Sequence, residues 1–600
     1  MNNEHNIPLR NEVKVSDTWD LSSLYADDGA WNKSLCEYEK LIEKIPSFKG
    51  TLGKSAEHLA DYLDFSRDLG ILGETLGSYA FLRQSEDEGA SAARTMVGKI
   101  TMAIAKANAA AAWDNPELLA IPEKDMEKYL AHNRIIDYRI YLQKVIRYKP
   151  HILSDKEERI MALHAEGEGA ISDTFSVLTN VDFNFGVIDT QEGKRPLTQS
   201  TFNVFMENPN RELRKQAYNM FYDCFDAHKT TLGSLYSGSV KQDVINARIR
   251  GYSSARAQAL FPDNVSESVY DNLIIAVNGK LDSLYKYYSI RKRVLKLDEL
   301  RRYDMAVPLV PNIKKTTTWN EAVDIVSAAL SPLGDEYVST LRTGLLARWA
   351  DRYENKGKHS GAYSAGGFTG DPYILMNYKE DSIRDVFTLA HEGGHSMHTW
   401  YSARNNPFMQ YNYTIFEAEV ASTFNEELLF RYLLKQTDDK NMRAFLINKH
   451  ADELLGTLYR QTMFAEFEKT THQLEEGGTP LTTELLREEY RKLLVKYFGH
   501  EVIFEETSDL EGLRVPHFYR AFYVYKYATG VSAALALADR VLSGGAKERE
   551  DYFAFLKSGG SRFPIDALKI AGVDMSSPEP VNAACDVFGK LVEELERLLG

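Results

Sequence analysis

The chain has 600 residues, and its 86 acidic side chains outnumber the 71 basic ones, which gives a net charge of −15. A surface this acidic repels phosphate, so we expect no binding to nucleic acid. Cys36, Cys224 and Cys585 form no CxxC pair, the first twenty residues hold no apolar signal segment, and the most apolar stretch, 530–538, is too short to span a bilayer. These features predict a cytoplasmic protein with no membrane partner, no disulfide framework and no thiolate metal site.

Helical periodicity dominates the sequence and predicts a mainly α fold. Six stretches carry apolar residues at helical spacing: 34–46, 91–112, 122–146, 154–178, 210–250 and 266–297. Three short segments have strand character: 181–189, 306–310 and 372–378. Pro and Gly gather between about 180 and 209, so we expect an N-terminal helical domain over 1–200 and a second domain over 201–600.

A second glycine cluster, GKHSGAYSAGGFTGDP, occupies residues 357–372. It lacks the GxxxxGK[ST] pattern of a phosphate-binding loop, because His359 follows Lys358. The sequence therefore does not favour a nucleotide site.

The clearest chemical pattern is an HExxH pentapeptide that contains His391, Glu392 and His395. The apolar residues before it predict a helix, and on a helix two residues four apart project from one face, a turn apart. Both imidazoles then close on one Zn²⁺ ion. The Glu392 carboxylate lies part of a turn away, where it reaches a water without occupying the ion, which suits the hydrolysis of an amide.

The helix that carries this pattern is expected to begin near Ser382, where Ser382 and Asp385 resemble a capping box, and to end near Pro407. Gly393 and Gly394 lie inside it, and a glycine in a helix costs about 1 kcal/mol relative to alanine. The sequence therefore predicts a close backbone approach at that face.

Two histidines leave the site one protein ligand short. A second helix, predicted to start near Ile415, offers four carboxylates, and spacing alone does not choose among them: Glu417, Glu419, Glu426 and Glu427. His398 lies on the same stripe as His391. Three histidines of one helix reach a single ion with tetrahedral geometry only under strain. We therefore expect His398 behind the ligands or in the cavity wall. The other possibility is that His398 is an alternative ligand.

Beyond HExxH, the chain resembles the M3 family of zinc metallopeptidases, the thimet oligopeptidase group, and most closely its oligoendopeptidase F branch. The motifs that carry the resemblance span nearly the whole sequence: DTWDLSSLY, GKHSGAYSAGG, PYILMNY, DVFTLAHEGGHSMH, FEAEVASTFNE, RQTMFAEFE and RVPHFYRAFYVYKYATG. The resemblance implies a large helical ellipsoid with a deep substrate channel and few short strands near the active site. The N-terminal domain would form part of the channel wall, and residues 201–600 would form the catalytic domain.

The resemblance also assigns the metal site. It implies one Zn²⁺ ion per chain, with His391, His395 and Glu419 as ligands and Glu392 as the catalytic base. Glu419 lies in the EVAS stretch, where the family places its third ligand.

His517 and Tyr525 match family residues that bind the substrate carbonyl and the oxyanion. Phe522 stands where some relatives carry another tyrosine, so Tyr519 and Tyr523 are further candidates for substrate binding. The tyrosines at 519, 523 and 527 also recur every four residues, which is ordinary helix packing.

Two further substrate-binding candidates come from the segment before the HExxH helix. PYILMNY is expected to be an edge strand that pairs with the extended main chain of a peptide. This places Tyr373, together with Gly361 in the glycine-rich loop before it, among the candidates.

The sequence thus predicts a zinc-dependent endopeptidase that hydrolyses internal bonds of short to medium oligopeptides. Zinc would polarise the scissile carbonyl, and Glu392 would take the proton of the attacking water. Two alternatives are a metallocarboxypeptidase on a similar helical scaffold and an inactive helical peptide-binding protein. The intact set of His391, Glu392, His395 and Glu419 argues against the second.

Overall fold

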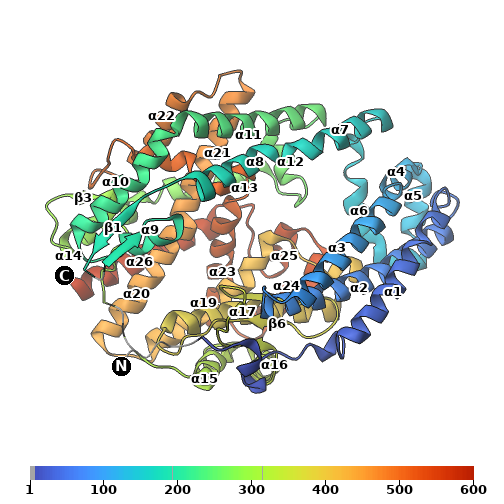
Figure 1. The fold of residues 1–600 in the computed structure, drawn as a ribbon, viewed down its shortest axis with the longest axis horizontal. Coiled ribbons are helices and arrows are strands. Elements are labelled where there is room, and N and C mark those ends of the chain that lie inside the picture. The colour runs from blue at the N-terminus through green and yellow to red at the C-terminus, as the bar shows by residue number, and fades with distance from the viewer. Residues whose placement is uncertain (1–6, 192, 312, 314) are drawn as a thin grey trace. The chain divides into compact units, whose positions relative to one another are not determined.

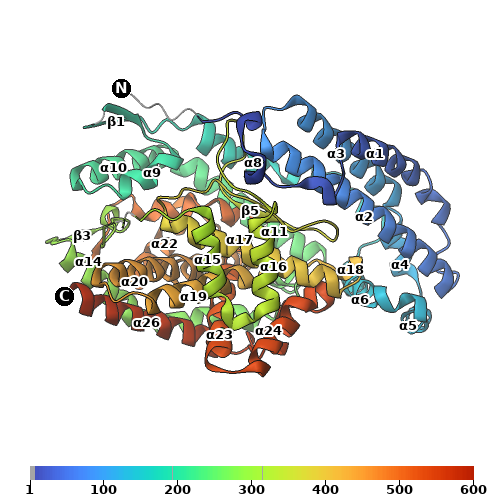
Figure 2. The ribbon, with the colours of Figure 1, turned by 90° about the horizontal axis from the view of Figure 1, so that it is seen from below.

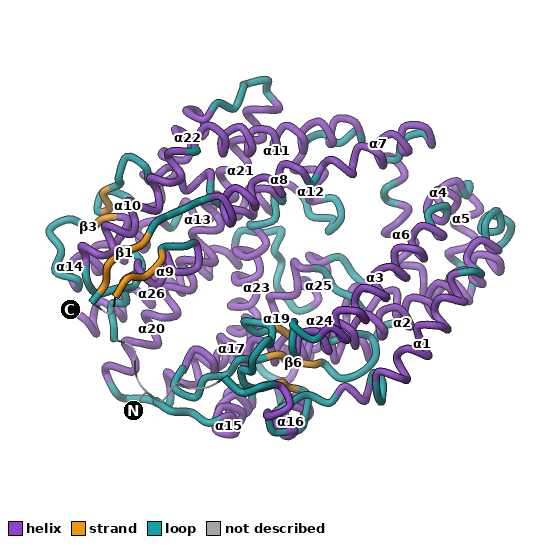
Figure 3. Tube along the Cα trace, viewed as in Figure 1, coloured by secondary structure: helices purple, strands orange, loops and turns teal. Residues whose placement is uncertain are grey.

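The computed structural model describes residues 7–191, 193–311, 313 and 315–600. Helices make up most of this part of the chain, and the strands are few and short (Figure 3). The chain forms two compact units, each assembled from three segments. The first unit comprises Met1–Lys149, Lys314–Leu433 and Leu537–Val573, and the second comprises Pro150–Ile313, Leu434–Ala536 and Asp574–Gly600. Neither unit follows the division predicted at residue 200, which stays a prediction.

The first unit contains helices from the N-terminal third, the middle and the C-terminal part of the chain: α1 (Asp28–Ile42), α2 (Ala56–Glu86), α3 (Ser91–Ala111), α4 (Asp114–Ala120), α5 (Glu123–Leu130), α6 (Arg139–Ile146), α15 (Trp319–Ala329), α16 (Asp335–Leu346), α17 (Ile383–Asn405), α18 (Phe408–Tyr411), α19 (Ile415–Lys435), α24 (Ala546–Ser558) and α25 (Pro564–Ile570). The long helices α2 and α3 run side by side, as do α15 and α16 (Figure 2). Buried aromatic residues of α1 and α2, including Trp31 and Tyr79, form a core that extends to Tyr373.

A three-stranded sheet lies beside α17 in the same unit. Its strands are β4 (Ala350–Asp351), β5 (Tyr363–Ala365) and β6 (Tyr373–Leu375), in the order β4-β6-β5. The strand within PYILMNY is therefore central, and the prediction of an edge strand there is wrong. Both sides of β6 are paired, parallel to β4 and antiparallel to β5, so its backbone is not open to a peptide. The edge strand next to α17 is β5.

The second unit is also mainly helical (Figure 1): α7 (Asp155–Glu168), α8 (Ala170–Val177), α9 (Gln199–Met206), α10 (Arg211–Ala227), α11 (Lys229–Ile249), α12 (Ala255–Leu260), α13 (Glu267–Asn278), α14 (Leu281–Val294), α20 (Lys440–Leu454), α21 (Arg460–Glu476), α22 (Thr483–Phe498) and α26 (Glu579–Leu599). Helix α23 (Tyr525–Ser543) begins in this unit and ends in the first. Two small sheets complete it: an antiparallel hairpin of β1 (Val187–Thr190) and β2 (Gly193–Pro196), and a parallel pair of β3 (Leu300–Arg301) and β7 (Val502–Ile503).

The six predicted helical stretches are helical, although several are interrupted. The stretch 91–112 is one helix, whereas 122–146 contains α5 and α6 with a 3₁₀ segment between them. The stretch 210–250 is split at His228 into α10 and α11. Of the predicted strands, 181–189 is a strand only from Val187 onward, and 306–310 is irregular. None of the described helices is long and apolar enough to cross a bilayer.

Candidate metal centre

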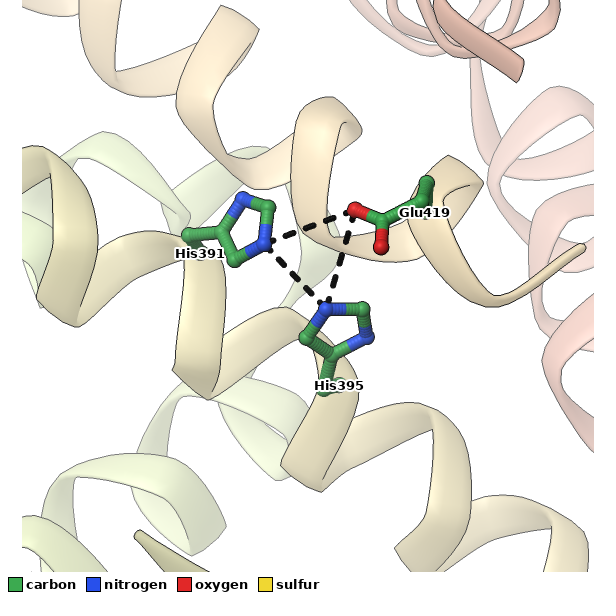
Figure 4. Close-up of side chains that lie close together, drawn as sticks. All are labelled: His391, His395 and Glu419. Carbon is green, nitrogen blue, oxygen red and sulfur yellow. Dashed lines mark hydrogen bonds and ion pairs between the residues drawn. The ribbon is translucent and has the colours of Figure 1, made fainter. Parts of the chain in front are cut away.

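The two histidines of HExxH project from one face of α17 toward each other (Figure 4). Their Nε2 atoms are 3.2 Å apart, and the rings meet nearly edge to face. The helix begins after Ser382, whose hydroxyl donates to Asp385 Oδ1 at 2.8 Å, and it ends at Asn405. Both ends agree with the prediction, so the spacing of the two imidazoles follows from the sequence.

Glu419 on α19 completes a group of three potential metal ligands (Figure 4). Its Oε2 lies 3.5 Å from His391 Nε2 and 3.9 Å from His395 Nε2. Bonds of about 2.0–2.2 Å at tetrahedral angles separate ligand atoms by about 3.3 Å, so the donor set matches the size and the chemistry of a site for a divalent ion such as zinc. Among the described residues this is the only such group of His, Cys, Asp and Glu side chains.

Gly394 explains why α19 reaches the histidines. A Cβ atom at this position would lie 2.5 Å from the carbonyl oxygen of Ala421 and 2.6 Å from Ser422 Cα, both in the backbone of α19. The predicted close approach therefore exists at Gly394. At Gly393, by contrast, an added Cβ would meet only the end of the Leu341 side chain, at 3.2 Å.

Two polar contacts fix α17 against its neighbours. Asn425 on α19 is fully buried, and its side-chain amide donates to the Ala390 carbonyl on α17 at 3.1 Å. On the side of the sheet, the hydroxyls of Ser364 in β5 and Ser396 in α17 are 2.8 Å apart. The ligands are therefore held by two helices and a strand rather than by a loop, which restricts their geometry.

Glu392 is buried, with 6 % of its surface exposed. Burial raises the pKa of its carboxyl to about 7, because the charge of His391 offsets only part of the desolvation and the neighbouring carboxylates Glu419 and Glu426 add repulsion. The backbone N–H of Ser364 in β5 donates to this carboxyl group. A carboxylate of such pKa is suited to exchange protons near neutral pH.

Glu426, one of the four carboxylates considered as third ligand, has a different place. His391 Nδ1 donates to Glu426 Oε1 at 2.5 Å, which leaves Nε2 facing the group of ligands. Burial alone would lower the pKa of His391, but the hydrogen bond and charge of Glu426, together with Glu392 and Glu419, raise it to about 9. A carboxylate on the far nitrogen of a metal-binding histidine fixes its orientation and its basicity.

His395 has the opposite electrostatics. Burial and the neighbouring positive charge of His391 lower its pKa to about 3, so the ring is neutral, and the backbone of Ala418 in α19 bonds the ring.

The role of Glu426 as the partner of His391 is what sequence reasoning missed. Glu426 lies seven residues after Glu419 and hence on the same face of α19, and this spacing was the available signal. Asn425 and Ser364 carried no such signal.

The other candidates on these helices lie away from the ligand group. Glu417 is buried and accepts from the backbone N–H of Thr414 at 3.2 Å, and Glu427 accepts from Arg431 at 2.6 Å. His398 is fully buried, and its ring stacks on Tyr413 at a centroid distance of 3.6 Å. Burial lowers the pKa of His398 to about 3. It does not belong to the group of three ligands.

His517, Tyr519, Tyr523 and Tyr525 all lie in the second unit. Tyr525 starts α23 and is fully buried, with its ring against Tyr270. Tyr519 stacks on Phe175, whereas Tyr523 is half-buried and stacks parallel to the exposed ring of His517 at 5.9 Å.

Phe522 in the same segment has a left-handed backbone, with φ +57°. Its N–H donates to the buried carboxyl of Glu468 at 2.8 Å, and burial raises the pKa of that carboxyl well above its ordinary value. A strained, anchored backbone of this kind is found where a segment must present its side chains in fixed positions.

Gly361 and Tyr373 both belong to the first unit but lie in different surroundings. Gly361 is exposed, with φ +83° and open space where a Cβ atom would lie. Tyr373 is 1 % exposed, and its hydroxyl donates to the Asp20 carbonyl at 2.9 Å. The structure therefore gives Tyr373 a role in the core of the unit.

Sequence comparison connects the whole chain to known peptidases. The family described as "Peptidase family M3" matches residues 204–587, and the family described as "Oligopeptidase F" matches residues 117–185. The chain is 42 % identical over 595 residues to "Oligopeptidase PepF" of Bacillus subtilis, covering 99 % of this chain and 89 % of that protein. It is 39 % identical over 600 residues to an "Oligoendopeptidase F homolog" of Borreliella burgdorferi, covering 98 % of this chain and 99 % of that one.

Solved structures give the same result. A putative peptidase from Chlamydophila abortus superposes with a TM-score of 0.92 at 34 % identity, covering 99 % of this chain and 100 % of that chain. Oligoendopeptidase-F from Enterococcus faecium superposes with a TM-score of 0.74 at 31 % identity, covering 95 % and 99 %. Similarity of this extent, in sequence and in a mainly helical fold, shows that the chain belongs to peptidase family M3 and is a metalloendopeptidase with a catalytic metal.

Proposed function

We propose that the protein is a zinc-dependent endopeptidase that hydrolyses internal bonds of short to medium oligopeptides. The observation that carries the proposal is the convergence of His391, His395 and Glu419 within 3.2 to 3.9 Å of one another, beside the buried Glu392. A bound zinc ion would supply Lewis-acid polarisation of the scissile carbonyl and lower the pKa of a water.

The chain's own residues would then move the proton. Glu392 takes the proton of the attacking water and passes it to the leaving amine. Its pKa of about 7 allows both steps near neutral pH, and the Ser364 N–H keeps the carboxyl group in place. Glu426 holds the His391 ring by Nδ1, so that Nε2 remains directed to the ion.

The edge strand β5 is the candidate for main-chain pairing with an extended peptide. It begins two residues after Gly361 and contains Ser364, whose backbone N–H donates to Glu392. Pairing of this kind contacts the main chain of the peptide and not its side chains, so we expect the protein to cleave after many different residues.

A metal-replacement experiment tests the proposal. An internally quenched peptide blocked at both termini is incubated with the protein before and after chelation, and then after addition of one equivalent of zinc, cobalt or manganese per chain. We expect activity to disappear on chelation and to return with one equivalent of zinc, and the products to show an internal cut. Activity that survives complete removal of metal would exclude the proposal, and an inability to cut blocked peptides would favour a carboxypeptidase.

The oxyanion-binding roles of His517 and Tyr525 are proposals that rest on the resemblance of residues 514–530 to the family. Removing an oxyanion donor costs about 10²–10³ in kcat. Tyr525→Phe and His517→Gln are compared with Tyr523→Phe and Tyr527→Phe, which delete hydroxyls from the half-buried neighbours. A kcat loss confined to Tyr523→Phe or Tyr527→Phe would transfer the role from the buried Tyr525 to an accessible tyrosine.

A further inference from the structure

The second unit contains a cavity of about 160 Å³ that involves none of the metal-site residues. Its wall is formed by α14, α20, α21, α22, the segment 302–306 and the turn that joins α20 to α21. This turn, Leu455–Tyr459, is π-helical, and such widened turns often occur at functional sites. The side chains with polar atoms on the wall are Tyr288, Arg302, Asp452, Tyr459, Arg460 and Tyr497. The Tyr459 hydroxyl already donates to the Lys280 carbonyl and the Tyr497 hydroxyl to Glu466.

The cavity has a basic side. Arg302 Nη2 donates to both carboxylate oxygens of Glu511, at 2.9 and 3.1 Å, and Arg460 Nη2 donates to the same carboxylate. Glu511 is 2 % exposed, so two guanidinium groups share one buried negative charge. Within the part of the chain that the structure describes, Nε and Nη1 of both arginines make no hydrogen bond. An anion inside the cavity would balance the excess positive charge and use these donors.

Two further groups complete the polar surface. Tyr288 is 1 % exposed and stacks on Phe498, and its hydroxyl has no hydrogen-bond partner among the described residues. The Arg302 guanidinium lies over the ring of the same Phe498, with Cζ 4.7 Å from the ring centroid. Phe498 therefore holds both Tyr288 and Arg302 in place. Asp452 has 43 % of its side chain exposed. Its Oδ2 accepts from Asn448 at 3.0 Å, its Oδ1 accepts from the Tyr287 hydroxyl, and Arg291 Nη1 lies 3.8 Å from Oδ1. The cavity thus offers anion-binding donors and a carboxylate.

The rest of the wall is apolar, and Phe498 and Ala306 belong to it. It includes Leu284, Met305, Leu455 and Met463. An apolar cavity of about 150 Å³ in another protein holds one benzene molecule, so this cavity fits a side chain of the size of valine or leucine. In a cavity this small, every group on the wall lies close to a ligand inside.

We propose that this cavity binds a free α-amino acid with an aliphatic side chain, which places its carboxylate on Arg302, Arg460 and the Tyr288 hydroxyl and its ammonium group on Asp452. Complete hydrolysis of peptides yields molecules of this class, and the binding itself does not depend on the catalytic site.

Calorimetry with the full chain tests the proposal. L-leucine is compared with N-acetyl-L-leucine, which lacks the positive charge, and with L-leucine amide, which lacks the negative charge. We expect saturable binding of one leucine per chain, and an affinity at least tenfold lower for each analogue. Equal binding of all three compounds, or no binding of leucine, would overturn the proposal.

Variants locate the binding. Asp452→Asn should lower the affinity for leucine at least tenfold and leave the affinity for N-acetyl-leucine unchanged. The matched control Asp438→Asn removes an exposed charge outside the cavity and should change neither affinity. Ala306→Phe adds a bulky ring to the wall without removing a charge and should abolish binding. His395→Ala removes a metal ligand and should leave binding intact. Leucine binding that persists in Ala306→Phe, or that is lost in His395→Ala, would place the ligand elsewhere and overturn the proposal.

Discussion

Glu392 shows how one residue obtains its chemistry from its surroundings. It belongs to the same helix as His391 and His395, but it is not a member of the group of ligands. Burial and nearby carboxylates raise its pKa to about 7, against an ordinary value near 4.5. The same side chain in solvent would be a weak base at neutral pH, so the position in the fold creates the function.

Glu392→Gln therefore separates metal binding from catalysis. The amide keeps the size of the side chain but accepts no proton, so we expect one metal ion per chain as in the wild type and a loss of about 10²–10⁴ in kcat. Elemental analysis gives the metal content, and a quenched peptide gives the rate. The control is Glu417→Gln, which changes a buried carboxylate of α19 outside the ligand group. This variant should keep both the metal content and the turnover of the wild type. Wild-type turnover in Glu392→Gln would disprove the role of general base.

His391 predicts a release of protons when metal binds. Its pKa of about 9 lies above neutrality, so at pH 7 the metal-free ring is charged, whereas an ion needs the lone pair of Nε2. We expect about one proton released per ion at pH 7, and fewer as the pH rises through 9. The same pKa means that the charged ring stabilises the metal-free fold below the unfolded pKa of about 6.5, and that this stabilisation is lost as the pH rises through 9. Calorimetry in buffers of different ionisation enthalpy counts the protons.

Glu426→Gln is the matched variant for this measurement. The glutamine oxygen still accepts from Nδ1 at the same position, but the negative charge that raises the pKa of His391 is gone. The variant should release clearly fewer protons at pH 7 and bind metal about 10–100-fold more weakly. An unchanged proton count would show that Glu426 does not control the ring.

At the scale of elements, the two adjacent glycines of α17 make a sharp comparison. Alanine is about 1 kcal/mol better than glycine inside a helix, so both replacements favour the isolated helix equally. A Cβ at Gly394 meets the backbone of α19 at 2.5 Å, whereas one at Gly393 meets the end of a flexible leucine at 3.2 Å. We expect Gly394→Ala to lower the melting temperature and to weaken metal binding at least tenfold. Gly393→Ala should do neither, and similar behaviour of the two variants would contradict the assignment.

Local patterns predicted the helices of the site well. The start and end of α17, the start of α19 at Ile415 and the need for a close approach at the glycines all follow from spacing and helix propensity. The capping box predicted at Ser382 is not formed, because the Ser382 hydroxyl donates to Asp385 and caps no backbone N–H. The paired position of β6 did not, because its second partner is the two-residue strand β4, which is too short to leave a pattern. Pairing between distant segments depends on tertiary contacts that periodicity does not encode.

The same limit applies to the choice among the four carboxylates of α19. Glu419 was singled out by family resemblance, whereas its geometry depends on where α19 crosses α17. Glu426 lies on the same face of α19 as Glu419. Its partner, Nδ1 of His391, belongs to α17, so the role of Glu426 also depends on how the two helices cross. A one-dimensional pattern names candidates, and the crossing of two helices decides between them.

At the scale of the whole molecule, the metal ligands all belong to the first unit. The three ligands lie on two helices, so a bound ion joins α17 to α19. A ligand that binds only the folded state stabilises it by about 2.7 kcal/mol at a hundred times its dissociation constant. This stabilisation acts first on the segments that the ion connects.

Hydrogen exchange with and without metal tests this localisation. Chelation should reduce the protection of amides in α17 and α19, because the ion no longer holds the helices together, and should leave α10 and α13 of the second unit unchanged. His395→Ala, which lacks one ligand, should show the reduced protection with or without added metal. Equal loss of protection across both units would contradict a local effect and would mean that the ion stabilises the chain as one cooperative structure.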